Sequence, residues 1–105
     1  MIKTISASEL KTQLEQRQPL ILLDVREDFE HRMAQIPGSL LIPQSQLRQN
    51  LDRLDHGRPV VVICHHGLRS LLAAKLLINQ GFKDVSNLEG GIDAWSLIDP
   101  SVPRY

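Results

Sequence analysis

The sequence has little of what marks several common protein classes. Its 105 residues include one cysteine, so an internal disulfide and a zinc site built on cysteine pairs are both excluded. The 12 Lys and Arg residues balance the 12 Asp and Glu residues, and this neutrality provides no field that attracts nucleic acid or an anionic bilayer. The longest apolar runs, residues 20–23 and 60–64, are far shorter than the ~20 residues that span a membrane.

We therefore expect a protein with no nucleic-acid partner and no membrane partner. The first residues lack the unbroken apolar stretch of a signal peptide, which predicts a cytoplasmic protein. A chain of this length buries about two-thirds of its unfolded surface when it folds, and 42% of its residues are hydrophobic. No repeat or linker interrupts the chain, so we predict one domain over residues 1–105.

Helices and strands are predicted to alternate along the chain. Ser6 and Glu9 have the spacing of a helix-capping box, and Leu10 and Leu14 continue the helix until Pro19. The apolar segment that follows does not alternate with polar residues, which is typical of a strand buried on both faces. The same reasoning predicts strands at residues 20–23, 40–42, 60–63 and within 82–88, and further helices at 27–33, 47–54, 69–80 and from 90 onward.

The strand at residues 60–63 is the clearest of these and should be central in the sheet. The helix at 69–80 is apolar nearly all round, so we expect it to pack broadly on the sheet. Helices between buried strands imply parallel pairing with right-handed crossovers. The predicted fold is α/β, with three layers: a small, mostly parallel sheet of about five strands and helices on both faces. Ligands bind outside the carboxyl ends of the strands in such folds.

The connection after strand 60–63 is the richest in reactive side chains. Unpaired N–H groups and the dipole at the start of the next helix favour a thiolate. An arginine adds a permanent charge, two histidines add charge in acidic solution, and a glycine lets the backbone curl. A serine at the end is expected to cap the helix. The connection reads Cys64, His65, His66, Gly67, Leu68, Arg69, Ser70.

Taken alone, Cys64 is better explained as a small apolar residue at the end of a buried strand, where most free cysteines lie. The residues that follow Cys64 change this interpretation. Two histidines, a glycine and an arginine occupy the one connection where an α/β sheet places its site. This combination favours a reactive thiol.

Four segments carry a family resemblance. The first is Cys-x-x-Gly-x-Arg-Ser, from Cys64 to Ser70; the others are Asp24-Val25-Arg26, Ile36-Pro37-Gly38-Ser39 and Leu88-Glu89-Gly90-Gly91-Ile92-Asp93-Ala94-Trp95. With these segments the chain resembles the single-domain rhodaneses, which are thiosulfate sulfurtransferases, over nearly its whole length. One departure is Ala34-Gln35, where the family usually has Gly-His, and it lies outside the cysteine loop.

The resemblance implies a reaction. In rhodaneses the cysteine thiolate attacks the outer sulfur of thiosulfate, sulfite leaves, and the persulfide passes its sulfur to cyanide or another thiol. Cys64 would be the catalytic nucleophile, and no cofactor is expected. The partners would be a small-molecule sulfur donor, a thiol or cyanide acceptor and, in addition, a sulfur-accepting protein. The substrate-binding residues would be His65, His66, Gly67, Leu68, Arg69 and Ser70, with Arg69 either binding the oxyanion or supporting the loop.

Loop length separates this reaction from its nearest enzymatic rival. Phosphatases of the cell-cycle type and some arsenate reductases resemble the same fold, with five residues between the cysteine and the arginine. Here four residues separate Cys64 from Arg69, and a smaller ring suits one sulfur atom better than a phosphate. A second alternative is a rhodanese-fold interaction module or persulfide carrier. Interaction modules of this fold have usually lost the cysteine, so the presence of Cys64 favours the enzyme.

Other polar residues are expected to have structural roles. We do not expect Cys64, His65 and His66 to be metal ligands, even with distant His31 or His56, because neighbouring residues rarely converge on one ion. No metal site is therefore expected, and His31 and His56 should be solvated.

The positions of two further segments indicate their roles. Asp24 and Arg26 follow a strand end, where they form either an ion pair or a substrate contact. The pair Gly90-Gly91 should permit a tight turn or close helix packing, and Trp95 should be in the core.

Overall fold

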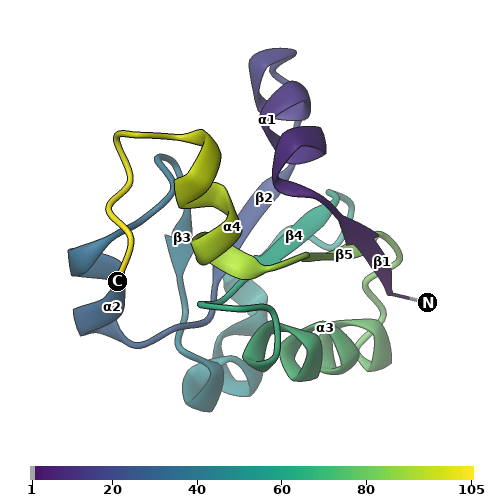
Figure 1. Cartoon of the computed structure of the whole chain (residues 1–105). Coiled ribbons are helices and arrows are strands. Elements are labelled where there is room, and N and C mark those ends of the chain that lie inside the picture. Colours follow the sequence, from purple (N-terminus) through teal and green to yellow (C-terminus); the bar gives the residue numbers. More distant parts are fainter. Residues whose placement is uncertain (1) are drawn as a thin grey trace.

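The computed structural model describes residues 2–105 and contains a five-stranded sheet in which each pair of neighbours is parallel (Figure 1). Its strand order is β1-β5-β4-β2-β3. The strands are β1 (Lys3–Ile5), β2 (Ile21–Asp24), β3 (Leu40–Leu41), β4 (Val60–Ile63) and β5 (Val85–Leu88). The predicted α/β class and the central position of the strand at residues 60–63 are both confirmed.

The central strand β4 is buried on both faces, as its unbroken apolar sequence predicts. Val60 and Val62 belong to one hydrophobic cluster, whereas Val61 and Ile63 belong to the other. This division follows from the strand geometry, because successive side chains point to opposite faces of a sheet. The chain therefore has two cores with the sheet between them.

Helices cover both faces of the sheet, which confirms the predicted three layers. Figure 1 shows α1 (Ala7–Glu15) and α4 (Gly91–Ile98) on one side and α3 (Arg69–Asn79) on the other. The short helix α2 (Asp28–Met33) lies beyond β3 near the C-terminal residue. In the part of the chain that the structure describes, no helix is long and apolar enough to cross a membrane.

The sequence correctly predicted the start of α1 and the end of α3. Ser6 caps α1 through a reciprocal pair of hydrogen bonds with Glu9, of 3.1 and 2.9 Å. Gly81 follows α3 with φ +95°, and Phe82 N–H donates to the Leu77 carbonyl, which closes the last turn.

The segment around residues 44–53 is not the α-helix that its leucine spacing predicted. It forms two 3₁₀ helices, Gln44–Gln46 and Arg48–Arg53, with a break at Asn50, whose φ is −124°. The Asn50 side-chain amide donates to the Gln46 carbonyl at 2.7 Å, and such local bonds compete with a regular helical ladder. Leu47 and Leu54 are nevertheless buried, as expected for the apolar face of the predicted helix.

Other boundaries also differ from the expectation. Strand β1 was not identified from the sequence, because a three-residue edge strand has too short a pattern to read. Strand β5 begins at Val85 rather than near Phe82, which packs into the core from the preceding turn. Helix α3 packs on one core cluster through Ala73, Ala74 and Leu77, and Leu76 and Ile78 are partly buried against the same cluster. Leu72 on its other side is exposed.

Candidate active site

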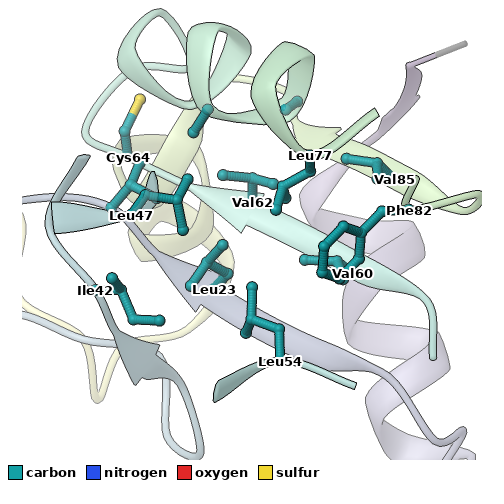
Figure 2. Packing of buried hydrophobic residues seen from close by; sticks show 13 residues of the cluster. Leu23, Ile42, Leu47, Leu54, Val60, Val62, Cys64, Leu77, Phe82 and Val85 are labelled. Carbon is teal, nitrogen blue, oxygen red and sulfur yellow. The ribbon is translucent and has the colours of Figure 1, made fainter. Parts of the chain in front are cut away.

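Cys64 lies directly after β4, at the carboxyl end of the sheet, and its residue surface is 1% exposed. Figure 2 shows its sulfur at one end of the buried cluster, directed away from the packed aliphatic side chains. The parallel register places Asp24 opposite Ile63, so the end of β2 lies beside the start of the cysteine loop. The site is thus where the open-sheet rule predicts it.

The loop curls back over the sulfur at Gly67. The Gly67 N–H donates to Cys64 Sγ at 3.0 Å, and Gly67 has φ +101°, a conformation that other residues rarely adopt. A donated N–H stabilises negative charge on sulfur.

The opposite side of the loop is held by the start of α4. Ile92 N–H donates to the Cys64 carbonyl at 2.8 Å, and Asp93 N–H donates to the His65 carbonyl at 3.1 Å. These bonds require close approach at Gly91, where a Cβ atom would lie 2.4 Å from the same two carbonyl oxygens. Close helix packing is therefore the reason for the glycine, as one of the two sequence interpretations proposed.

Ser70 does not cap α3, contrary to the prediction. The N-cap position is Leu68, and Ser70 lies inside the helix with its hydroxyl turned toward β5. Asn87 of β5 donates from Nδ2 to the Gly67 carbonyl at 3.0 Å and accepts the Ser70 hydroxyl proton at Oδ1. Since the hydroxyl proton is used there, Ser70 Oγ offers a lone pair to the Cys64 thiol, 3.3 Å away.

Arg69 is bound by a carboxylate from another element. Its Nη1 and Nη2 donate to Glu30 Oε1 and Oε2 at 2.6 and 2.8 Å, and the side chain is 38% exposed. The hydrogen bonds from Arg69 lower the pKa of the Glu30 carboxyl to about 2. This bidentate pair joins the cysteine loop to α2, an arrangement that fits loop support, one of the two roles that the sequence left open for Arg69.

Tyr105 connects this pair to a second, buried one. Its hydroxyl donates to Glu30 Oε2 at 2.9 Å and accepts from Arg26 Nη1 at 2.6 Å. Burial raises the pKa of the Tyr105 phenol, so the phenol remains a donor at neutral pH. Asp24 and Arg26 form an ion pair at 2.7 Å with both side chains buried. They are therefore structural rather than in contact with substrate.

The two loop histidines stack on one another with ring centroids 3.9 Å apart. His65 also stacks on Tyr105 at 4.0 Å, and its Nε2 donates to the Tyr105 main-chain oxygen at 2.9 Å. His66, by contrast, is exposed.

Asp93 completes a group with His65 and His66 that could present ligand atoms to a metal, all within 4.8 Å of one another. One ion would have to lie in the planes of both imidazoles, whereas the two rings are stacked at 26°. Asp93 is also paired with Arg104 at 2.8 Å. The present side-chain arrangement is thus that of a polar cluster whose members already have partners.

The other two histidines lie elsewhere. His31 Nε2 is 3.3 Å from Ser39 Oγ, and His56 is exposed and stacks against Phe82.

Four residues that contact the loop were not singled out from the sequence for this role. They lie on other elements, and no local pattern links a glutamate or tyrosine to a cysteine loop many residues away. They are Glu30, Asn87, Asp93 and Tyr105.

Comparison with known proteins agrees with this geometry. The family model of the rhodanese-like domain matches residues 6–97. The chain belongs to the rhodanese-like family. The resemblance predicted from the sequence motifs is therefore confirmed.

Three relatives of this rhodanese-like chain are similar to it over most of their length. The "Putative sulfurtransferase YtwF" of Bacillus subtilis is 42% identical over 94 residues, which cover 90% of each chain. The "Thiosulfate sulfurtransferase GlpE" of Coxiella burnetii is 32% identical over 101 residues, covering 96% of this chain and 94% of that protein. The crystal structure of a rhodanese-like domain protein from Staphylococcus aureus has a TM-score of 0.87 at 33% identity, covering 98% of both chains.

Proposed function

We propose that this rhodanese-like protein is a sulfurtransferase in which Cys64 takes a sulfane sulfur from thiosulfate or another donor and passes it to cyanide or a thiol. The observation that carries the proposal is the position of Cys64 Sγ, 3.0 Å from the Gly67 N–H inside a loop tied to α2, α4 and β5. Relatives named as sulfurtransferases add support.

The reaction would proceed in two displacements. The Cys64 thiolate attacks the outer sulfur of thiosulfate, the S–S bond breaks, and sulfite leaves with the bonding electron pair. The resulting Cys64 persulfide is then attacked at its outer sulfur by the acceptor, and the Cys64 thiolate is regenerated. Once the nucleophile is a thiolate, neither step needs a general base, because sulfite leaves without a proton.

The loop backbone would stabilise the negative charge on the reacting sulfur. The Gly67 N–H that stabilises a thiolate is equally suited to a persulfide anion one bond longer. We propose residues 65–70 as the substrate-binding segment, since they follow Cys64 directly and two of them, Gly67 and Ser70, contact its sulfur. This chemistry requires a small-molecule sulfur donor and a thiol or cyanide acceptor, and we propose a sulfur-accepting protein as a further partner.

Phosphoryl transfer is less well supported. The ring between Cys64 and Arg69 is one residue shorter than that of the phosphatases, and the fork of Arg69 already holds a carboxylate. A tetrahedral phosphate needs that fork for itself.

Intact-mass measurement after brief treatment with thiosulfate tests the proposal. We expect native protein to gain one sulfur atom, Cys64→Ser to gain none, and cyanide to restore the original mass with release of thiocyanate. Many cycles per molecule would identify an enzyme, whereas a single discharge would identify a carrier. Hydrolysis of an aryl phosphate faster than sulfur transfer would replace our proposal with the phosphatase.

A further inference from the structure

The segment after α4 is anchored by contacts of its own. Val102 is buried in the hydrophobic cluster that includes residues of α4, and its N–H donates to the Asp99 carbonyl at 3.1 Å. Arg104 pairs with Asp93 at 2.8 Å. Figure 1 shows this segment, in yellow, running from α4 to lie beside α2. It carries Tyr105 to the space between α2 and the cysteine loop.

Tyr105 contacts the residue that follows Cys64 directly. Its ring stacks on the His65 ring, with centroids 4.0 Å apart and planes 9° from parallel. Its main-chain oxygen accepts from His65 Nε2 at 2.9 Å. The His65 ring is also stacked on His66. These contacts fix the start of the cysteine loop.

Through Glu30, Tyr105 also reaches Arg69 at the end of the loop. The Tyr105 hydroxyl donates to Glu30 Oε2 at 2.9 Å, and the same oxygen accepts from Arg69 Nη2 at 2.8 Å. The second oxygen, Oε1, accepts from the Glu27 N–H at 3.0 Å. One such donor on each oxygen fixes the plane of the carboxylate, and a bidentate pair with a guanidinium depends on that plane. The hydroxyl therefore helps to set where Arg69 lies.

The Tyr105 hydroxyl is itself held by a rigid donor. Arg26 Nη1 donates to it at 2.6 Å, and the Arg26 side chain is fully buried and paired with Asp24. Arg26 also donates to the carbonyls of Glu30 and Ala34. Because several partners fix this donor, the hydroxyl links the loop to a rigid part of the molecule.

Gly67 lies in the middle of the segment whose ends, His65 and Arg69, are held in this way. Its N–H donates to Cys64 Sγ, and such a donor stabilises a thiolate or a persulfide only while its distance and angle to the sulfur are kept. Fixing both ends of a short segment removes most of its backbone freedom. The Gly67 carbonyl is held separately from β5, so loss of the two end contacts should loosen the loop without unfolding it.

We infer that Tyr105 is a positioning residue for sulfur transfer. Its ring fixes the start of the cysteine loop at His65, and its hydroxyl fixes the end of the loop through Glu30. The inference rests on the proposed function and adds a residue to its machinery. Tyr105 acts through the loop, by keeping the Gly67 N–H where the negative sulfur forms, rather than on the donor itself.

Three variants of the whole chain separate the two contacts. Tyr105→Phe keeps the ring and removes the hydroxyl, whereas Tyr105→Leu removes both. Val102→Ala is the matched control, because Val102 anchors the same segment in the core. The measurement is the rate of single-turnover loading of Cys64 from saturating thiosulfate, followed by intact mass.

We expect the loading rate to fall about threefold in Tyr105→Phe and at least about tenfold in Tyr105→Leu. Val102→Ala should change the rate by less than about twofold, since it destabilises the segment without removing either contact. A native rate in Tyr105→Leu, or an equal loss in Val102→Ala, would overturn the inference. Should Tyr105→Leu fail to fold, the comparison of Tyr105→Phe with Val102→Ala decides alone.

A double-mutant cycle tests the route through the Glu30–Arg69 pair. In an Arg69→Ala background, Tyr105→Phe should have no further effect on the loading rate, because the hydroxyl then has no guanidinium to orient. Single effects that multiply in the double variant would contradict this route. Failure of the native protein to gain sulfur would instead reject the proposed sulfurtransferase function, so the two failures are distinguishable.

Discussion

Ser70 shows how a single hydrogen-bonding choice affects the reactive sulfur. The Gly67 carbonyl accepts only, so the Asn87 amide must turn Nδ2 toward it and Oδ1 toward Ser70. Ser70 must then donate to Asn87, which leaves it as an acceptor for the Cys64 thiol. In this arrangement Ser70 stabilises the neutral thiol, while the Gly67 N–H stabilises the thiolate.

Replacing Ser70 with alanine is therefore expected to make Cys64 more reactive rather than less. Loss of one hydrogen bond to the thiol should raise the alkylation rate by iodoacetamide at neutral pH about two- to fivefold. Ser86→Ala is the matched control, because Ser86 neighbours Asn87 on β5 and points to the other face. A slower reaction of Ser70→Ala would mean that the hydroxyl donates to the thiolate.

At the scale of elements, α4 acts as a brace for the cysteine loop. Its first N–H groups satisfy the Cys64 and His65 carbonyls, which would otherwise be buried without donors. The brace depends on Gly91, which has φ +60° and no space for a side chain.

The contribution of this contact can be separated from backbone strain by comparing two glycines. Gly91→Ala combines a positive φ with a clash against two carbonyl oxygens, whereas Gly81→Ala has φ +95° and nothing within 4 Å of the added Cβ. Denaturant unfolding should show a loss of about 1–2 kcal/mol for Gly81→Ala and at least about 3 kcal/mol for Gly91→Ala. Equal losses would show that the clash with the two carbonyl oxygens adds nothing to the cost of a positive φ.

At the scale of the whole molecule, Glu30 joins parts of the chain that are far apart in sequence. It holds Arg69 at the start of α3 and accepts from Tyr105 in the C-terminal segment. Tyr105 in turn contacts Arg26 and His65. Loosening this junction should therefore affect global stability as well as the loop.

The stability of the junction should depend on pH with a definite sign. The pKa of Glu30 is about 2 in the folded protein, against an ordinary value of 4.5. Its stabilisation is therefore complete above about pH 4.5 and is lost as the pH falls from 4.5 toward 2; its size is on the order of 3 kcal/mol. Urea unfolding of native protein across this range should show the loss.

Glu30→Gln should be less stable than native protein at pH 7 and should approach it near pH 2. Asp28→Asn is the control, since its ion pair with Arg32 is exposed and such pairs contribute less than about 1 kcal/mol. Parallel pH profiles of native protein and Glu30→Gln would contradict the assignment.

Sequence alone was enough for the alternation of elements, the central strand, the cysteine loop and the family. These depend on local signals: the unbroken apolar run of β4, the capping box at Ser6, the glycine after α3 and the loop spacing from Cys64 to Ser70. Each of these is read within a few consecutive residues, where propensity and periodicity act.

Only the tertiary structure decided what each loop side chain contacts. Ser70 bonds to Asn87 rather than capping its helix, Arg69 is held by Glu30, and His65 is stacked on Tyr105. These partners come from α2, β5 and the C-terminal segment, brought together by parallel strands whose carboxyl ends meet at one edge. A hydrogen bond depends on the distance and angle between two atoms, and sequence spacing carries no information on either when the partners are many residues apart.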